Sequence, residues 1–112
     1  MKKDNTLYLR NMVDKAEEAL LFCRDSSEAE FLQNNMLQSA VVMKLIVIGE
    51  EARKLLPEIT DSIDLPWRLI MGFRNMAVHE YFNLDMSQVW VSVHDDLPEL
   101  IKKSKEYLAA LA

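Results

Sequence analysis

The chain has 112 residues, half of them apolar, with only two glycines and three prolines and a formal net charge of −5. The apolar content excludes a disordered chain, and the scarcity of glycine and proline argues against a β-rich fold, which needs many turns. The acidic balance excludes generic nucleic-acid binding through a basic surface, so any such contact must use a local basic pocket. We expect one all-α domain over residues 1–112.

Two helices are expected in the first half of the chain. Apolar residues recur at helical spacing and predict an amphipathic helix from about Asp4 to Arg24. Ser26 or Ser27, followed by glutamate, then supplies a break and a helix cap. A second helix should run from about Glu28 to Leu56, because no turn signal other than a glycine interrupts its apolar centre. Since this helix is apolar nearly all round, it should be the central one.

Prolines mark the element boundaries in the second half. Pro57 ends the second helix and begins a connector, and Pro66 stands in the first turn of a third helix. Asp85 or Ser87 caps a fourth helical stretch, in which Pro98 should cause a kink or a split. The two tryptophans and seven methionines are expected to serve in packing. These elements predict a bundle of four to five helices.

Several classes of site lack the residues that they need. Cys23 is the sole cysteine, so no disulfide can form within the chain, and a reducing cytosol suits it. The sequence has no Cys/His ligand set or Glu-x-x-His pair for a metal and too few glycines for a phosphate-binding loop. It shows no signal peptide and no apolar run long enough to span a membrane. We therefore expect a cytoplasmic protein without a metal, a cofactor or a membrane span.

Polar groups are concentrated in "FRNMAVHEY", inside the third helix. Arg74 is a planar cation that matches phosphate oxygens, and His79 can move a proton near neutral pH. Asn75 can orient the imidazole from one helical turn away, and Tyr81 offers a hydroxyl and a ring on which a base can stack. Such a set suits metal-independent RNA cleavage, in which the ribose 2′-OH attacks the adjacent phosphate.

The helical spacing of this stretch leaves its role open. On a continuous helix Arg74 and His79, five residues apart, point about 140° away from each other, whereas Arg74 and Tyr81 share a face. Either the helix ends near His79, or a second copy of the chain brings its own motif alongside. By spacing alone an ordinary amphipathic helix is the better explanation, because such pairs are common. Gly49, inside the second helix, should mark the close approach of another backbone.

Several segments resemble one known family. "RNMAVHEY" has the HEPN superfamily signature of arginine, four residues, histidine, one residue and tyrosine, and the asparagine after the arginine resembles the HepT-like ribonuclease toxins. "VIGEEARKL" and "LPWRLIMGFRN" before the motif and "DLPEL" after it are similar to the same family in the same order. The resemblance covers nearly the whole chain and is strongest from Ile46 to Leu100. It implies a homodimeric, all-α HEPN-type bundle.

The resemblance also implies a function. It is that of an endoribonuclease toxin of a type II/VII-like toxin–antitoxin system, which cuts RNA without a metal in a cleft between two copies. Its partner would be a minimal nucleotidyltransferase antitoxin, which can transfer AMP from ATP to Tyr81. By position, Arg74 and His79 are catalytic, Asn75 and Tyr81 support them, and the cleft is lined by Gly49 and Glu50. A non-catalytic helical subunit of a nucleotidyltransferase complex and a structural dimer with a vestigial motif stay open as alternatives.

Overall fold

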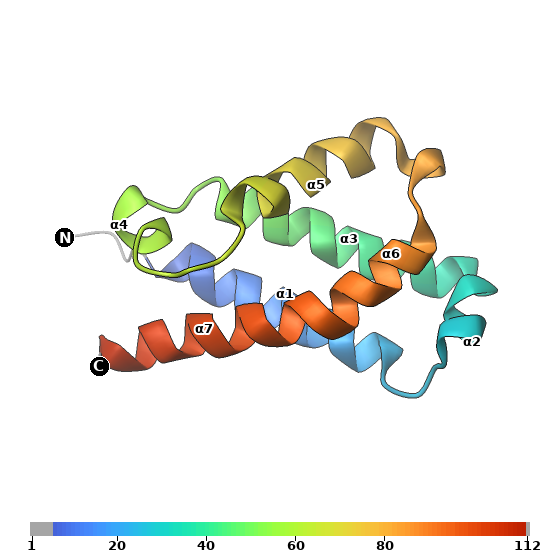
Figure 1. Ribbon diagram of the computed structural model, residues 1–112, viewed down its shortest axis with the longest axis horizontal. Helices are drawn as coiled ribbons and strands as arrows, with labels where there is room; N and C mark the ends of the chain where they lie inside the picture. The colour runs from blue at the N-terminus through green and yellow to red at the C-terminus, as the bar shows by residue number, and fades with distance from the viewer. Residues whose placement is uncertain (1–5, 112) are drawn as a thin grey trace.

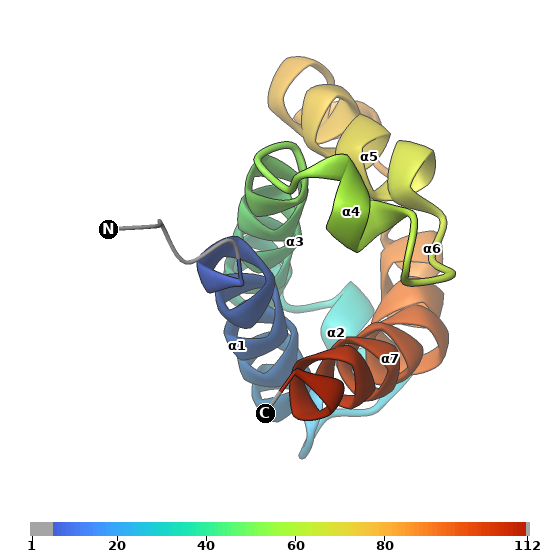
Figure 2. The same ribbon diagram turned by 90° about the vertical axis from the view of Figure 1, so that its left-hand side faces the viewer.

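The computed structural model describes residues 6–111, which form an all-α bundle without strands (Figure 1). Its four longer helices are α1 (Leu7–Cys23), α3 (Asn35–Ala52), α5 (Trp67–His79) and α7 (Leu97–Ala110). Three short helices connect them: α2 (Glu28–Leu32), α4 (Pro57–Thr60) and α6 (Met86–Val91). Seen end-on, the helices surround a common interior (Figure 2). The predicted fold class is thus confirmed, while the predicted start of the first helix at Asp4 lies outside the described residues.

Helix α3 is the central helix of the bundle, as its apolar composition predicts. It packs against α1 on one side and against α5 on the other, and α1 in turn packs against α7. The core combines fully or nearly fully buried side chains from all parts of the bundle, among them Leu9, Met12, Phe31, Val41, Ile48, Val93 and Leu100. Burial of each such side chain contributes about 1.5–3 kcal/mol to folding.

The predicted long helix from Glu28 to Leu56 is wrong, because the chain breaks into α2 and α3. Asn34 adopts an extended conformation and its side chain accepts a hydrogen bond from the Leu37 amide at 3.0 Å, which starts α3 afresh. The Gln38 side chain donates to the Phe31 carbonyl at 3.0 Å and so satisfies the end of α2. This break turns α2 inward, so that Phe31 is fully buried.

The other boundaries follow local chemistry. Ser27 and Glu30 form the predicted capping box at the start of α2, and Asp85 accepts from the Ser87 amide at 2.9 Å to cap α6. The prediction that Pro57 ends the second helix is wrong, because α3 already ends at Ala52; Pro57 instead begins the single turn α4 inside the predicted connector. Pro66 is the N-cap of α5 rather than a residue of its first turn.

The expected irregularity before Pro98 is a π-helical turn, Ser92–Asp96, between α6 and α7. Proline lacks an N–H, and its ring collides with the carbonyl of the residue four positions earlier, here His94. A wider turn relieves both constraints without ending the helical path. The His94 ring stacks on Trp90, with centroids 4.0 Å apart, and Trp90 also packs on Phe31.

Methionine packing is only partly as expected. Met12 is fully buried, but Met36 and Met43 on α3 are 82% and 55% exposed. They therefore leave apolar surface in contact with solvent. Among residues 6–111, no helix has the length and apolar character needed to cross a bilayer.

Candidate functional site

Helix α5 carries the predicted motif and is fixed on α3 by a close approach at Gly49. A Cβ atom placed on Gly49 would lie 2.8 Å from the Arg74 Cβ and 3.0 Å from the Ile70 carbonyl oxygen. No larger residue fits there without moving α5, because such distances are shorter than van der Waals contact. The expected approach of another backbone at Gly49 is confirmed, and it puts Arg74 directly over α3.

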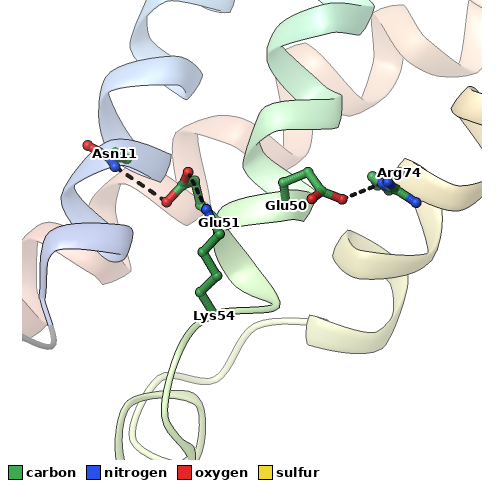
Figure 3. Close-up of polar contacts among 5 residues, drawn as sticks. All are labelled: Asn11, Glu50, Glu51, Lys54 and Arg74. Carbon is green, nitrogen blue, oxygen red and sulfur yellow. Dashed lines mark hydrogen bonds and ion pairs between the residues drawn. The ribbon is translucent and has the colours of Figure 1, made fainter.

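Arg74 is held at this crossing by Glu50, the residue after Gly49. The Arg74 Nε and Glu50 Oε1 atoms form an ion pair, and both atoms are inaccessible to solvent. Figure 3 shows the two side chains reaching toward each other, while the neighbouring Glu51 turns away to Asn11 and Lys54. The two adjacent carboxylates thus tie α3 to α5 on one side and to α1 on the other.

Asn75 completes the surroundings of the guanidinium. One Nη atom of Arg74 donates to the Asn75 side-chain oxygen at 3.0 Å. Asn75 therefore orients the arginine, and within the described residues it makes no bond to His79, the imidazole that it was expected to hold. Arginine has five N–H donors, so those on its second Nη atom stay available to an anion.

His79 is the last residue of α5 and is exposed. The helix does end at this residue, as one of the two expectations has it, but His79 does not swing toward Arg74. Five helical residues separate the two by about 7.5 Å along the axis and about 140° around it. Within residues 6–111 the chain gives His79 no hydrogen-bond or ion-pair partner. One chain by itself therefore holds the arginine on the α3 side and leaves the histidine facing solvent.

Tyr81 lies apart from the arginine. It begins a 3-10 turn, Tyr81–Asn83, and its hydroxyl is 3.2 Å from the Ser39 hydroxyl on α3. Ser39 precedes Glu50 by eleven residues, or about 16 Å of helix. The expectation that Tyr81 continues the face of Arg74 is wrong, because α5 has already ended. The sequence carried no signal for the Ser39 contact.

Apolar surface adjoins the ion pair and extends along α3 from Glu50 to Met36, over about 21 Å. Met36, Met43 and Glu50 are spaced by seven residues, which places them on one stripe of α3. Val78, one turn after Arg74 on α5, is also exposed. Exposed apolar groups around a charged pair are typical of a surface that another molecule covers.

A separate pocket lies along the other flank of α5. It has a volume of about 660 Å³ and is bounded by α3, α5, the π-helical turn and α7. Its lining is mainly apolar, with Leu45, Leu69, Phe73, Met76 and Leu100 among its residues. None of Arg74, Asn75, His79 and Tyr81 lines it. The residues described contain no group of three or more His, Cys, Asp and Glu side chains suited to a metal ion.

Comparison with known proteins gives a consistent family. Residues 12–107 match the family model described as "Ribonuclease HepT-like". A "Putative RNase" of Methanocaldococcus jannaschii is 30% identical over 103 residues, which cover 91% of this chain and 94% of that protein. A "Probable ribonuclease HepT" of Thermococcus cleftensis is 31% identical over 102 residues, covering 89% of this chain and 92% of that protein. No solved structure matches the chain significantly.

The two glycines predict opposite effects of alanine on stability. Gly49→Ala should lower the free energy of unfolding by about 1–2 kcal/mol, because the strain of overpacking exceeds the gain in helix propensity. Gly72→Ala, where an added Cβ meets nothing within 4 Å, should raise it by about 1 kcal/mol. Urea denaturation of both variants at one protein concentration measures the difference. Stabilisation by Gly49→Ala would contradict the close approach of α5.

Proposed function

This chain belongs to the HepT-like ribonuclease family of the HEPN superfamily, and from that premise we propose that Arg74 and His79 cleave RNA without a metal ion. The observation that carries the proposal is how the motif holds its arginine and its histidine. Arg74 is fixed by Glu50 and Asn75 with N–H donors to spare, and His79 is exposed at the end of the same helix.

In the proposed reaction the ribose 2′-oxygen forms a bond to the adjacent phosphorus while the bond to the 5′-oxygen breaks. The products are a 2′,3′-cyclic phosphate and a 5′-hydroxyl end. His79 takes the proton from the 2′-OH or returns one to the leaving oxygen, and Arg74 stabilises the charge on the phosphoryl oxygens. Tyr81 and Asn75 are supporting residues, and Gly49 and Glu50 line the cleft.

We also propose a homodimer in which two motifs share one cleft. The geometry within one chain supports this, because Arg74 and His79 diverge and make no contact with each other. A second copy placed against the apolar surface around the ion pair would bring its own histidine near the arginine. Met36, Met43 and Val78 supply the exposed apolar area that such a contact needs.

The cellular role that fits this activity is a toxin controlled by a second protein in the cytoplasm. A minimal nucleotidyltransferase antitoxin would transfer AMP from ATP to the Tyr81 hydroxyl, with pyrophosphate as the leaving group. Tyr81 is partly exposed and lies two residues after His79. A bulky anionic group there would compete with substrate RNA for the same surface.

We expect cleavage in the presence of a chelator, with 2′,3′-cyclic phosphate ends, because acid–base and electrostatic catalysis need no metal. His79→Ala should reduce the rate by about 10²–10⁴-fold. Arg74→Lys should also lower it strongly, because lysine keeps the charge beside Glu50 but loses the planar fork.

His94→Ala is the matched control for the histidine variant, since His94 is exposed and stacks on Trp90 outside the site. It should cleave at the wild-type rate. Activity that EDTA abolishes and a divalent ion restores would contradict the mechanism. An inactive wild-type protein would favour the non-catalytic subunit of a nucleotidyltransferase complex.

The dimer can be tested by placing a charge on the apolar surface around the ion pair. Met43→Asp should shift the protein toward the monomer in sedimentation velocity and lower the rate of cleavage in parallel, because a carboxylate cannot be buried there without a partner. Leu69→Asp, on the opposite flank of α5 and 72% exposed where Met43 is 55% exposed, serves as control. Dissociation by Leu69→Asp alone would place the dimer contact on the wrong side of α5.

Modification is tested by intact-mass spectrometry after co-expression with a minimal nucleotidyltransferase and ATP. The protein should gain the mass of whole adenylyl groups and lose RNA cleavage, and phosphodiesterase should reverse both. Tyr81→Phe should prevent the gain, whereas Tyr107→Phe on α7 should not. Inhibition without any change in mass would make steric blockade the means of control.

A further inference from the structure

The outward face of α5 carries four exposed residues in register. Arg68, Gly72, Asn75 and His79 follow one another at intervals of four, three and four residues, so they form one stripe along the helix. All four are exposed, and Arg68 and Gly72 also line the apolar pocket beside α5. From Arg68 to His79 this outer stripe is about 16 Å long. It is separate from the α3 side of the helix, where Arg74 pairs with Glu50.

Gly72 in the middle of the outer stripe has no explanation within the chain. Glycine destabilises a helix relative to alanine, so a helical glycine indicates that something comes close to the backbone. For Gly49 that neighbour is α5 itself, but a Cβ added to Gly72 would meet nothing within 4 Å. Within the described part of the chain there is no such neighbour, which leaves the helix backbone at Gly72 open to another molecule.

The charge of α5 indicates what that molecule is. The protein has 18 acidic residues, yet α5 contains arginine and no carboxylate, which holds for none of the other described helices. Arg74 is partly neutralised by Glu50, whereas Arg68 has no ion pair within the residues described. The outer stripe thus offers a cation, an amide and an imidazole to a ligand, which suits a polyanion.

We propose that an RNA strand lies along the outer stripe, with Arg68 binding a phosphate some distance from the scissile bond. Gly72 lets the sugar–phosphate backbone approach the helix, and the strand continues past Asn75 to His79. This inference rests on the proposed function, to which it adds a binding residue. A second copy fits the outer stripe less well, because neither face would offer a carboxylate to pair with the arginine of the other, and the exposed apolar groups lie on the flanks instead.

The test measures binding separately from cleavage, with a mixed-sequence 2′-O-methyl RNA oligonucleotide that lacks the attacking hydroxyl. Arg68→Gln should weaken binding several-fold and make the dependence of log K on log salt shallower by about 0.7, the loss of one phosphate contact on a single strand. Arg24→Gln, which removes an exposed arginine at the end of α1, should change neither. Equal binding by Arg68→Gln and the wild type would overturn the proposal.

A variant at Gly72 provides the second test of the proposal. Gly72→Leu should weaken binding about tenfold, because its side chain occupies the path of the strand, while its thermal unfolding stays at or above that of the wild type. Loss of the dimer with unchanged RNA affinity would mean that a second copy covers the outer stripe, and would overturn the proposal.

The kinetic readout distinguishes the two hypotheses. If the protein cleaves RNA, Arg68→Gln should raise KM and leave kcat nearly unchanged, because the contact is remote from the reacting atoms. A wild-type protein that binds the oligonucleotide through Arg68 but cuts no RNA would refute the proposed catalysis and support this inference. A wild-type protein that binds no RNA would overturn the inference itself.

Discussion

The close approach of α3 and α5 at Gly49 is the constraint on which the rest of the site depends. Because no Cβ intervenes, Arg74 sits directly on α3 and reaches the carboxylate of the next residue, Glu50. That ion pair fixes the rotation of α5 about its own axis. Once the rotation is fixed, helical geometry alone determines which residues of the motif face α3 and which face solvent.

The residues of the motif therefore have different surroundings, those of the arginine being fixed by contacts and those of the histidine being open. Arg74 and Asn75 bond to each other, and Arg74 also belongs to the contact between two helices, so its charge has a structural role beside the catalytic one proposed for it. Within residues 6–111 His79 has no such contacts and is positioned only by the helix that ends with it. The proposed catalytic pair thus has one rigid member, Arg74, and one accessible member, His79. Its assembly into a single site then depends on what binds to the outside of α5.

The sequence predicts the helical class and several of the element ends, because these follow from local chemistry. The Ser27 capping box, the Asp85 cap and the irregularity before Pro98 are examples. It does not predict the break at Asn34, since asparagine in a polar stretch is as compatible with an exposed helical position as with a cap. Only the burial of Phe31 decides between them, and that depends on tertiary packing. The site shows the same division: the glycine at position 49 signalled a close approach, but the Ser39 contact of Tyr81 arises only after α5 ends.

The π-helical turn at Ser92–Asp96 determines how the helical segment from α6 to α7 responds to a change in its length. Val89, Val93 and Leu97 are all buried although they are spaced by four residues, a spacing that drifts about 40° per step on a regular α-helix. The wider turn absorbs this drift and keeps both α6 and α7 facing the core. The turn thus sets the rotation of α7 relative to α6 about their common helical path. Because a π turn accommodates one residue more than an α turn, deletion of one residue within it would restore a regular α-helix of nearly the same phase, whereas insertion of one residue would rotate everything beyond it and expose the apolar side of α7 to water.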